Sequence, residues 1–146
     1  MSMFGNNLLQ GLLGNLSEVP LDFLNKEYGA YLMDGENIHV GFKLVRDALI
    51  ITDRRIISFD KQGATGQKML VESIYLDSIY YVTAETSGFG LDDCQLDIEY
   101  ISSPCLRAHN AKIQCRTFEF PKRYNIQGLY KMLQEIAYQN YTRLNT

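Results

Sequence analysis

The fold of this chain is decided by the stretch Phe42-Lys-Leu-Val-Arg-Asp-Ala-Leu-Ile-Ile-Thr-Asp-Arg-Arg-Ile-Ile-Ser-Phe-Asp-Lys-Gln-Gly63. Apolar runs rich in β-branched and aromatic residues alternate here with the polar pairs Arg46-Asp47 and Asp53-Arg54. Such runs suit a pleated sheet, and the polar pairs suit tight turns between strands. The stretch therefore predicts three short antiparallel strands joined by two hairpin turns.

The residues just before this stretch extend the pattern, because apolar and polar side chains alternate between residues 36 and 45. The apolar set is Ile38, Val40, Phe42 and Leu44, and the other set is Asn37, His39, Gly41 and Lys43. A period of two residues is typical of a strand with one buried face. We therefore expect the apolar set to point inward and the other set outward.

The same meander is predicted to continue downstream, with strands over residues 68–75, 79–86, 94–100 and 111–120. In the last strand, the inward positions are expected to be Ile113 and Cys115, and the outward ones Lys112, Gln114 and Arg116. The outward set can then face Asp97 and Glu99 across the hairpin as opposite-charge pairs, although charges placed for solubility alone would look the same.

Helical periodicity predicts two helices before the sheet and one after it. The first covers residues 1–16, with apolar residues at Phe4, Leu8, Leu9, Leu12, Leu13 and Leu16. This apolar face is compatible with docking on its own domain, on a neighbouring subunit or at a membrane interface, and the lack of Lys and Arg disfavours the membrane. The second is expected to begin at Ser17 as N-cap, with Pro20 in its first turn and Gly35 as its stop signal. The last follows the N-cap Asn125, and its apolar stripe is Ile126, Leu129, Tyr130, Leu133, Ile136, Ala137 and Tyr141.

These elements predict a mostly β fold with added helices. The seven antiparallel strands are expected to form a sandwich or partly open barrel, and the C-terminal amphipathic helix is expected to cap one end. We expect an N-terminal helical leader over residues 1–35 and a β domain over residues 36–146, together making a single compact domain of 146 residues.

Composition excludes several classes of function. The net charge of −3 and pI of about 5.3 provide no basic field for nucleic acid. The three cysteines are an odd number without a CxxC pair, which favours reduced thiols, and we expect a cytoplasmic location. Neither a signal peptide nor an apolar run long enough for a membrane span is indicated.

Several motifs together resemble the bacterial pleckstrin-homology (PH)-like domain family. They are Lys43-Leu-Val-Arg-Asp47, Ile51-Thr-Asp-Arg-Arg-Ile56, Asp60-Lys-Gln-Gly63 with Thr65-Gly-Gln-Lys68, Ser73-Ile74 before Ile79, Glu85-Thr-Ser-Gly88 before Leu91-Asp92, and the leader Leu13-Gly-Asn-Leu-Ser-Glu-Val19. The resemblance covers almost the whole chain. It implies a PH-like fold, assembly into ring-shaped homo-oligomers and no enzymatic activity, while the family's physiological role is largely undefined.

No constellation for catalysis, a cofactor or a metal is found. His39 and His109 are scattered along the chain, and no Ser or Cys stands beside a base in the sequence. Cys94 and Cys115 fall on predicted inward positions, which favours core thiols. We therefore expect no enzyme.

Lipid binding is the first hypothesis for a PH fold, and the charges argue against a phosphoinositide-specific site. Phosphate recognition needs several converging cations. The weak anion-contact candidates are Lys43, Arg46, Arg54 and Arg55. Lys43 and Arg46 are expected at one end of the hairpin ribbon, and Arg54 and Arg55 at the other. An aspartate lies beside each pair in the sequence.

Interaction with protein partners, the chain itself above all, is the leading hypothesis. The candidate interface residues are Phe4, Leu8, Leu12, Tyr75, Tyr80 and Tyr81. Tyrosine is enriched at interfaces, although ordinary half-buried tyrosines would look the same in sequence. We expect a non-enzymatic module that self-assembles, as a cyclic homo-oligomer, and has an unknown protein partner. The alternative is a peripheral membrane or lipid-binding module that uses multivalent weak contacts.

Overall fold

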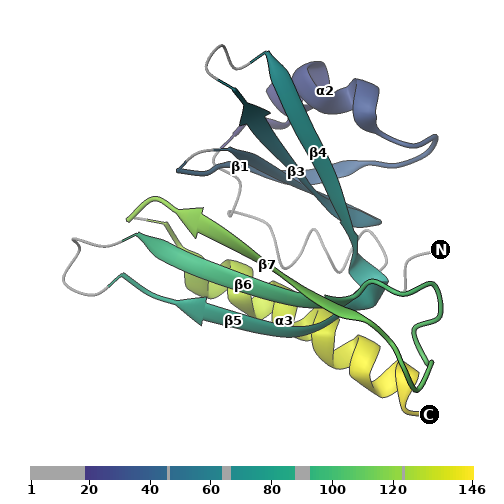
Figure 1. Cartoon of the computed structure of the whole chain (residues 1–146). Helices are drawn as coiled ribbons and strands as arrows, with labels where there is room; N and C mark the ends of the chain where they lie inside the picture. Colours follow the sequence, from purple (N-terminus) through teal and green to yellow (C-terminus); the bar gives the residue numbers. More distant parts are fainter. Residues whose placement is uncertain (1–18, 46, 64–66, 88–92, 123) are drawn as a thin grey trace. The chain divides into compact units, whose positions relative to one another are not determined.

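A computed structural model of the chain describes residues 19–45, 47–63, 67–87, 93–122 and 124–146. The chain divides into two compact units, Met1–Ile74 and Tyr75–Thr146 (Figure 1). Each unit contains one open antiparallel sheet. The seven strands follow the predicted order, and the C-terminal helix follows the last of them. The predicted boundary at residue 35 stays a prediction.

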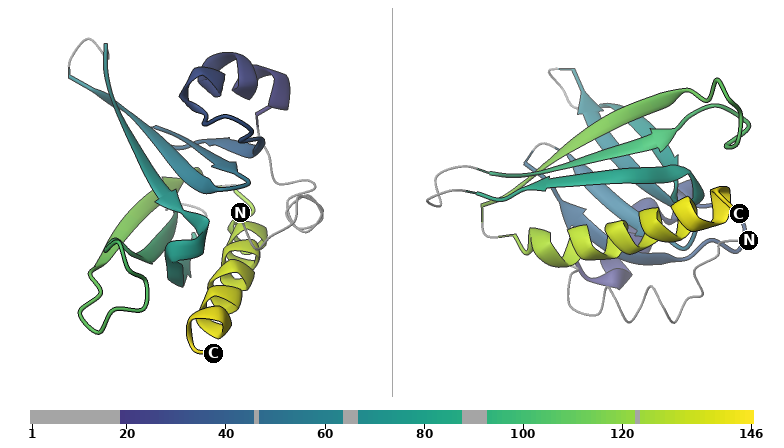
Figure 2. Two further views of the ribbon diagram at one scale, coloured as in Figure 1. Left: turned by 90° about the vertical axis from the view of Figure 1, so that its right-hand side faces the viewer. Right: turned by 90° about the horizontal axis from the view of Figure 1, so that it is seen from below.

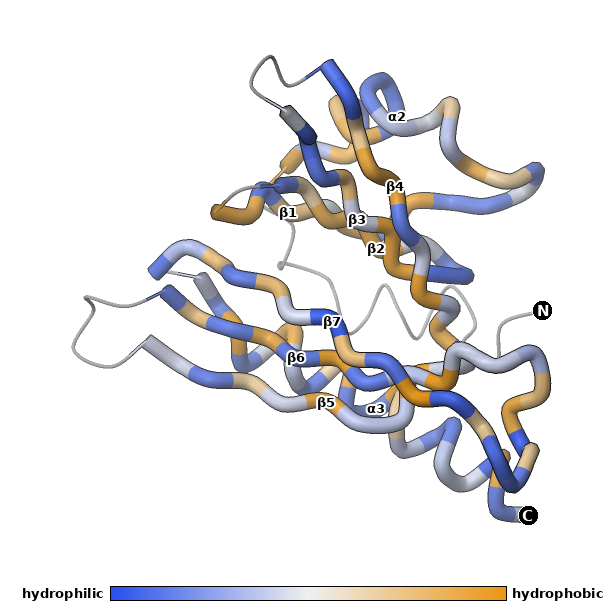
Figure 3. Tube along the Cα trace, in the orientation of Figure 1, coloured by the Kyte–Doolittle hydropathy of each residue, from blue (hydrophilic) through white to orange (hydrophobic). Residues whose placement is uncertain are grey.

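The first unit has a four-stranded sheet covered on one face by a short helix. Its elements are α2 (Leu21–Tyr28), the 3-10 turn η1 (Gly29–Tyr31), β1 (Ile38–Lys43), β2 (Ala48–Thr52), β3 (Arg55–Gln62) and β4 (Lys68–Tyr75), with the strands in the order β1-β2-β3-β4. The tube in Figure 3 shows that β2 is apolar along most of its length, as expected for a strand buried on both faces.

The start of α2 differs from the prediction. The helix begins at Leu21, and Pro20 occupies the N-cap position with an extended backbone (φ −58°, ψ 142°). The first helical hydrogen bond runs from Leu24 N to Pro20 O at 3.1 Å. A helix start at Ser17 is therefore wrong, because the backbone of Pro20 is still extended. Ser17 itself, like the helix predicted for residues 1–16, lies outside the described residues.

A β-bulge at His39 contradicts the predicted division of β1 into one inward and one outward set of side chains. Ile38 pairs with Thr52, but Val40 already pairs with Ile51, so His39 is an extra residue in β1. Since each inserted residue reverses the alternation, Ile38 and Val40 lie on opposite faces of the sheet. Both are buried, which shows that β1 has two buried faces.

The core on the α2 side of this sheet is built around Leu24. It contains Leu24, Ile38, Ile50, Ile57 and Phe59. Gly41 belongs to this packing, since a Cβ atom placed there would lie 2.5 Å from Leu24 Cδ1 and 3.0 Å from Leu24 Cγ. The predicted outward position of Gly41 is therefore wrong, and the missing side chain lets α2 approach the sheet closely.

The second unit has a three-stranded sheet and a long helix. Its elements are the 3-10 turn η2 (Leu76–Ser78), β5 (Ile79–Glu85), β6 (Cys94–Ile101), β7 (Ile113–Phe120) and α3 (Ile126–Leu144), with the strands in the order β5-β6-β7. Helix α3 runs along this sheet and contacts β5, β6 and η2 (Figure 2). The predicted N-cap is confirmed, because Asn125 Oδ1 accepts a hydrogen bond from Gly128 N at 3.3 Å.

The buried stripe of α3 matches the prediction over its middle and departs at its end. Tyr141 is 64% exposed, and Asn140 beside it is fully buried. The Asn140 side-chain nitrogen donates to the carbonyl oxygens of Leu76 at 2.7 Å and Ile79 at 2.8 Å. These bonds explain how a polar residue is buried at a helix position outside the predicted apolar stripe.

The inward and outward positions of β7 are the reverse of the prediction. Phe118 and Phe120 are buried, whereas Ile113 is 52% exposed and Cys115 is also exposed. The register places Cys115 opposite Glu99. Because side chains alternate between the two faces, only one of the two sets can point inward along the whole strand. The set with Phe118 and Phe120 is inward because it has more apolar area to bury than the set with Ile113 and Cys115.

The predicted charge pairs across this hairpin are wrong for the same reason. Arg116 lies opposite Ile98 and stacks over the Phe118 ring at 5.4 Å. Asp97 instead faces Thr117, whose hydroxyl donates to the carboxylate at 2.5 Å.

Candidate functional site

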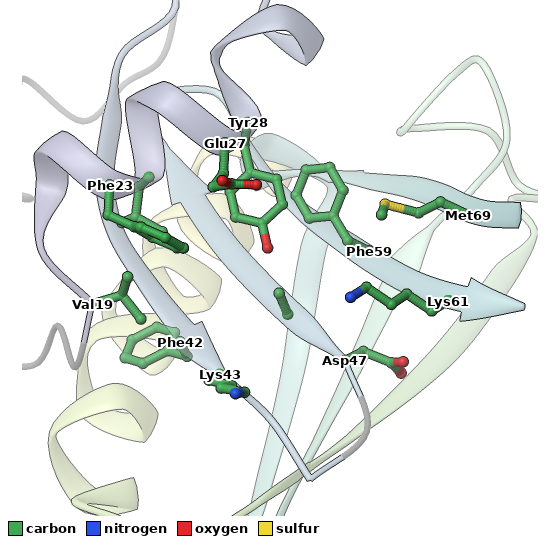
Figure 4. Close-up of a pocket in the computed structure, with 12 residues that line it drawn as sticks. Val19, Phe23, Glu27, Tyr28, Phe42, Lys43, Asp47, Phe59, Lys61 and Met69 are labelled. Atoms are coloured by element: carbon green, nitrogen blue, oxygen red, sulfur yellow. The ribbon is translucent and has the colours of Figure 1, made fainter. Parts of the chain in front are cut away.

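A pocket of about 280 Å³ lies between α2 and the four-stranded sheet (Figure 4). It exists because α2 has only eight residues and is therefore about 12 Å long, whereas strands of six to eight residues run for roughly 20–27 Å. Part of the sheet face is left uncovered beside the helix. The lining residues are Val19, Phe23, Leu24, Glu27, Tyr28, Phe42, Lys43, Asp47, Ala48, Phe59, Lys61 and Met69.

The walls of this pocket are mainly aromatic and aliphatic. Tyr28 of α2 stacks on Phe59 of β3 with ring centroids 4.2 Å apart. Burial, assisted by the charges of Glu27 and Tyr31, raises the pKa of the Tyr28 hydroxyl, so this wall stays uncharged at neutral pH. Phe23 on α2 is 50% exposed. The pocket therefore offers apolar surface that the described residues only partly cover.

The charges at the pocket are balanced. Two cations, Lys43 and Lys61, and two carboxylates, Asp47 and Glu27, belong to the lining. Recognition of a phosphate group relies on cations that converge on it without opposing carboxylates. The pocket is thus suited to an apolar group without net charge.

The predicted anion-contact candidates do not come together. Lys43 is exposed and pairs with Ala48 at one end of the β1-β2 ladder, whereas Arg54 follows the opposite end, where Ile38 pairs with Thr52. Arg46 lies outside the described residues. The separation of the two ends agrees with the sequence-based expectation.

The fourth candidate, Arg55, has a structural partner instead. Its Nε donates to Glu36 Oε2 at 2.9 Å and one terminal nitrogen donates to Glu36 Oε1 at 2.9 Å. The terminal nitrogens also donate to the Tyr31 carbonyl and the Ser73 hydroxyl, each at 2.8 Å. Four of the five guanidinium N–H donors are thus used within the unit, which leaves little capacity for an external anion.

The partner carboxylate, Glu36, is fully buried at its side chain. Burial alone would raise its pKa, but hydrogen bonds from Arg55, the Thr52 hydroxyl and Met33 N outweigh burial and lower the pKa of Glu36. Glu36 is therefore ionised in the folded chain. The pair fastens the segment that follows α2 onto β2 and β3.

The predicted interface tyrosines are exposed to different degrees. Tyr75 is 60% exposed and Tyr81 is 55% exposed, while Tyr80 is half-buried. The rings of Tyr80 and Tyr81 lie 6.3 Å apart. Burial, followed by Glu99, Cys115 and Tyr81, raises the pKa of Tyr80. The leader candidates Phe4, Leu8 and Leu12 lie outside the described residues.

A second exposed surface was missed by the sequence analysis. Strand β4 is an edge of its sheet, and of its eight residues, all described, only Ile74 is buried. Met69 and Leu70 are neighbours and therefore point to opposite faces, yet they are 38% and 46% exposed. Sequence alone predicted a strand here but not that apolar side chains would be exposed on both of its faces.

The described residues hold no group of three or more potential metal ligands among His, Cys, Asp and Glu side chains. In the same residues, no helix combines the length and apolar content needed to cross a membrane. Cys94 is a buried thiol, whereas Cys105 and Cys115 are exposed, so the predicted core position of Cys115 is wrong.

Comparison with known proteins places this geometry in a family context. A family model described as "Bacterial PH domain" matches residues 7–137, a range that spans both units. An uncharacterized protein, YjqA, from Bacillus subtilis (strain 168) is 36% identical over 130 residues, which cover 88% of this chain and 97% of that protein.

Two solved structures are similar over nearly their whole length. The pleckstrin homology domain from Shewanella amazonensis SB2B is 32% identical with a TM-score of 0.62, covering 88% of this chain and 97% of that one. A DUF1696 family protein with a pleckstrin-homology domain from Shewanella loihica PV-4 is 28% identical with a TM-score of 0.61, covering 83% and 96%. These likenesses confirm the predicted PH-like fold, and the chain belongs to the bacterial PH domain family.

Proposed function

We propose that this chain is a non-enzymatic interaction module that self-associates through protein contacts, as a ring-shaped homo-oligomer. The observation that carries the proposal is the edge strand β4, which exposes Met69 on one face and Leu70 on the other.

An exposed edge strand is a template for pairing with another strand. Its outer row of backbone N–H and C=O groups can add main-chain hydrogen bonds to a second chain. Protein edges that avoid such pairing usually carry charge or proline; β4 carries Lys68 and Glu72, but the three residues between them, Met69-Leu70-Val71, are all apolar. Strand addition at β4 would therefore bury apolar side chains as well as satisfy the backbone.

A ring requires a second, different surface on each copy, because a head-to-tail contact joins unlike patches. Tyr81 of β5, more than half exposed, is assigned to this second surface together with Tyr80, whereas the exposed Tyr75 is the last residue of β4 and belongs to the first surface. Large amphipathic rings bury much area with little loss of side-chain freedom. The leader residues Phe4, Leu8 and Leu12 are proposed to add to the same contact.

The test is a matched pair of surface variants measured by sedimentation velocity. Leu70→Lys places a charge on the β4 edge, and we expect it to shift the protein toward a single 16.7 kDa chain. Tyr138→Lys alters a larger and more exposed residue, 63% exposed on α3, and should leave the assembly intact. An unchanged oligomer in Leu70→Lys would remove β4 from the interface.

A vesicle experiment separates this proposal from the peripheral membrane alternative. Co-sedimentation of the wild-type chain with anionic vesicles that is lost at high salt would favour the membrane alternative, because salt screens surface charge. If self-association is the main function, we expect the same oligomer with and without vesicles and no salt-dependent sedimentation.

A further inference from the structure

The pocket beside α2 has the chemistry to hold apolar, uncharged side chains. Phe23 and Met69 border it while 50% and 38% exposed, and the two cations and two carboxylates of its lining balance each other. A cavity of about 150 Å³ lined by apolar side chains binds a benzene-sized group. The volume of about 280 Å³ therefore has room for roughly two leucine-sized groups.

The chain carries a segment of matching chemistry directly beside this pocket. Residues 1–17 contain no Asp, Glu, Lys or Arg, and their apolar residues include Leu13 and Leu16. Val19, the first described residue, is itself part of the pocket lining. The uncharged segment is thus separated by one residue, Glu18, from Val19 at the wall of the pocket.

Chain length limits where these leucines can lie. An extended chain spans at most about 3.6 Å per residue, so Leu16 stays within about 11 Å of Val19 and Leu13 within about 22 Å. A tether this short gives an effective concentration in the millimolar range for docking in the same chain. We propose that the leader docks into the pocket of its own chain through Leu13 and Leu16.

This docking goes beyond self-association and does not depend on it. Phe4 lies fifteen residues before Val19 and Leu8 lies eleven before it. The two leucines nearest Val19 suffice to fill the pocket volume, so the earlier apolar residues stay available for contacts between copies.

The absence of tryptophan from the chain allows a clean test by fluorescence. Leu16→Trp in the full chain introduces one fluorophore at the docking position, and Gln10→Trp introduces one at a polar leader position as the control. Docking should shift the Leu16→Trp emission to the blue and reduce its quenching by acrylamide several-fold relative to the control. Equal emission and quenching in the two variants would overturn the proposal.

A second substitution tests the pocket itself. Phe23→Lys, at an exposed position of the lining, is expected to move the Leu16→Trp emission back to the red, while Tyr138→Lys should leave it unchanged. Circular dichroism checks that each variant is folded, and Leu13→Trp replaces Leu16→Trp if the latter is not. A blue shift that survives Phe23→Lys would place the leader elsewhere.

Dilution distinguishes the chain's own leader from a neighbour's. Docking within one chain is independent of concentration, so the blue shift should persist over about a thousandfold dilution. A shift that disappears as the oligomer dissociates would assign the pocket to a second copy and overturn the proposal. A stable shift in a monomeric protein would uphold docking while self-association failed.

Discussion

Removal of Arg55 is predicted to be among the most destabilising single changes in the first unit. The substitution Arg55→Met keeps much of the apolar stem but removes the charge that pairs with Glu36. The Glu36 side chain has no solvent exposure, and its carboxylate would keep only the hydrogen bonds from the Thr52 hydroxyl at 2.6 Å and Met33 N at 2.9 Å. An uncompensated buried charge typically costs about 3–5 kcal/mol.

The opposite substitution serves as the control. In Glu36→Gln the amide oxygen still accepts from Arg55, and the Arg55 side chain is 13% exposed and can gain water. We expect a cost of about 1–2 kcal/mol, typical of a weakened hydrogen-bond set. The double variant Glu36→Gln/Arg55→Met should recover part of the loss, because it buries no charge.

The pH dependence of these costs gives an independent check. The folded pKa of Glu36 lies below its ordinary value of 4.5, so the pair contributes stability above pH 4.5 that is lost as the pH falls through the folded pKa. In Arg55→Met the unpaired carboxyl is protonated more readily, which relieves the buried charge in acid. The difference from wild type should therefore be largest near neutral pH and shrink below the ordinary carboxyl pKa.

Urea denaturation followed by circular dichroism at several pH values measures these differences as shifts in midpoint at constant slope. A cost below about 1 kcal/mol for Arg55→Met at neutral pH, or a cost independent of pH, would refute the argument that Arg55 neutralises a buried carboxylate.

Two further substitutions and one labelling experiment test the packing. Gly41→Ala should lower the free energy of unfolding by about 1–3 kcal/mol, because the added methyl group overpacks the contact with α2. In a Leu24→Ala background the same methyl group should be neutral or stabilising. If the costs of the two substitutions simply add in the double variant, the close contact between Gly41 and Leu24 is contradicted. Asn140→Ala should cost about 2–3 kcal/mol, because two buried carbonyl groups lose their donor; an unfolding midpoint equal to wild type would count against this. A thiol reagent under native conditions should modify Cys115 and spare Cys94, as read by mass spectrometry of peptides, and modification of Cys94 before unfolding would contradict its burial.

The order of elements was predictable because it rests on local periodicity. The strands between Phe42 and Gly63 are indicated by apolar runs that alternate with polar pairs. Helix α3 is indicated by apolar residues on one helical face and by Asn125 as its N-cap. These patterns depend on residues that are close in sequence and not on long-range contacts. The strand order and the C-terminal helix were therefore predicted correctly.

The faces of individual strands were not predictable in the same way. A single bulge at His39 reverses alternation along β1, and nothing in the local sequence marks it. In β7 both alternating sets contain apolar residues, so the choice between Cys115 and Phe118 for the interior depended on what the rest of the unit could bury.

The candidate site was less predictable still, because it is formed by residues distant in sequence. The pocket joins α2 to β3 and β4, and its existence depends on how little of the sheet an eight-residue helix can cover. The poor convergence of Lys43 and Arg54, by contrast, followed from hairpin register alone and was anticipated. The ion pair of Arg55 with Glu36 could have been suspected only from the burial of both, which sequence does not give.

The proposed self-association of this PH-like module sets the mass of the wild-type chain in solution. Light scattering coupled to gel filtration measures this mass without reference to shape. We expect one defined multiple of 16.7 kDa that persists across loading concentrations. A mass of 16.7 kDa at every concentration would contradict it, and the exposed β4 edge would then require another explanation.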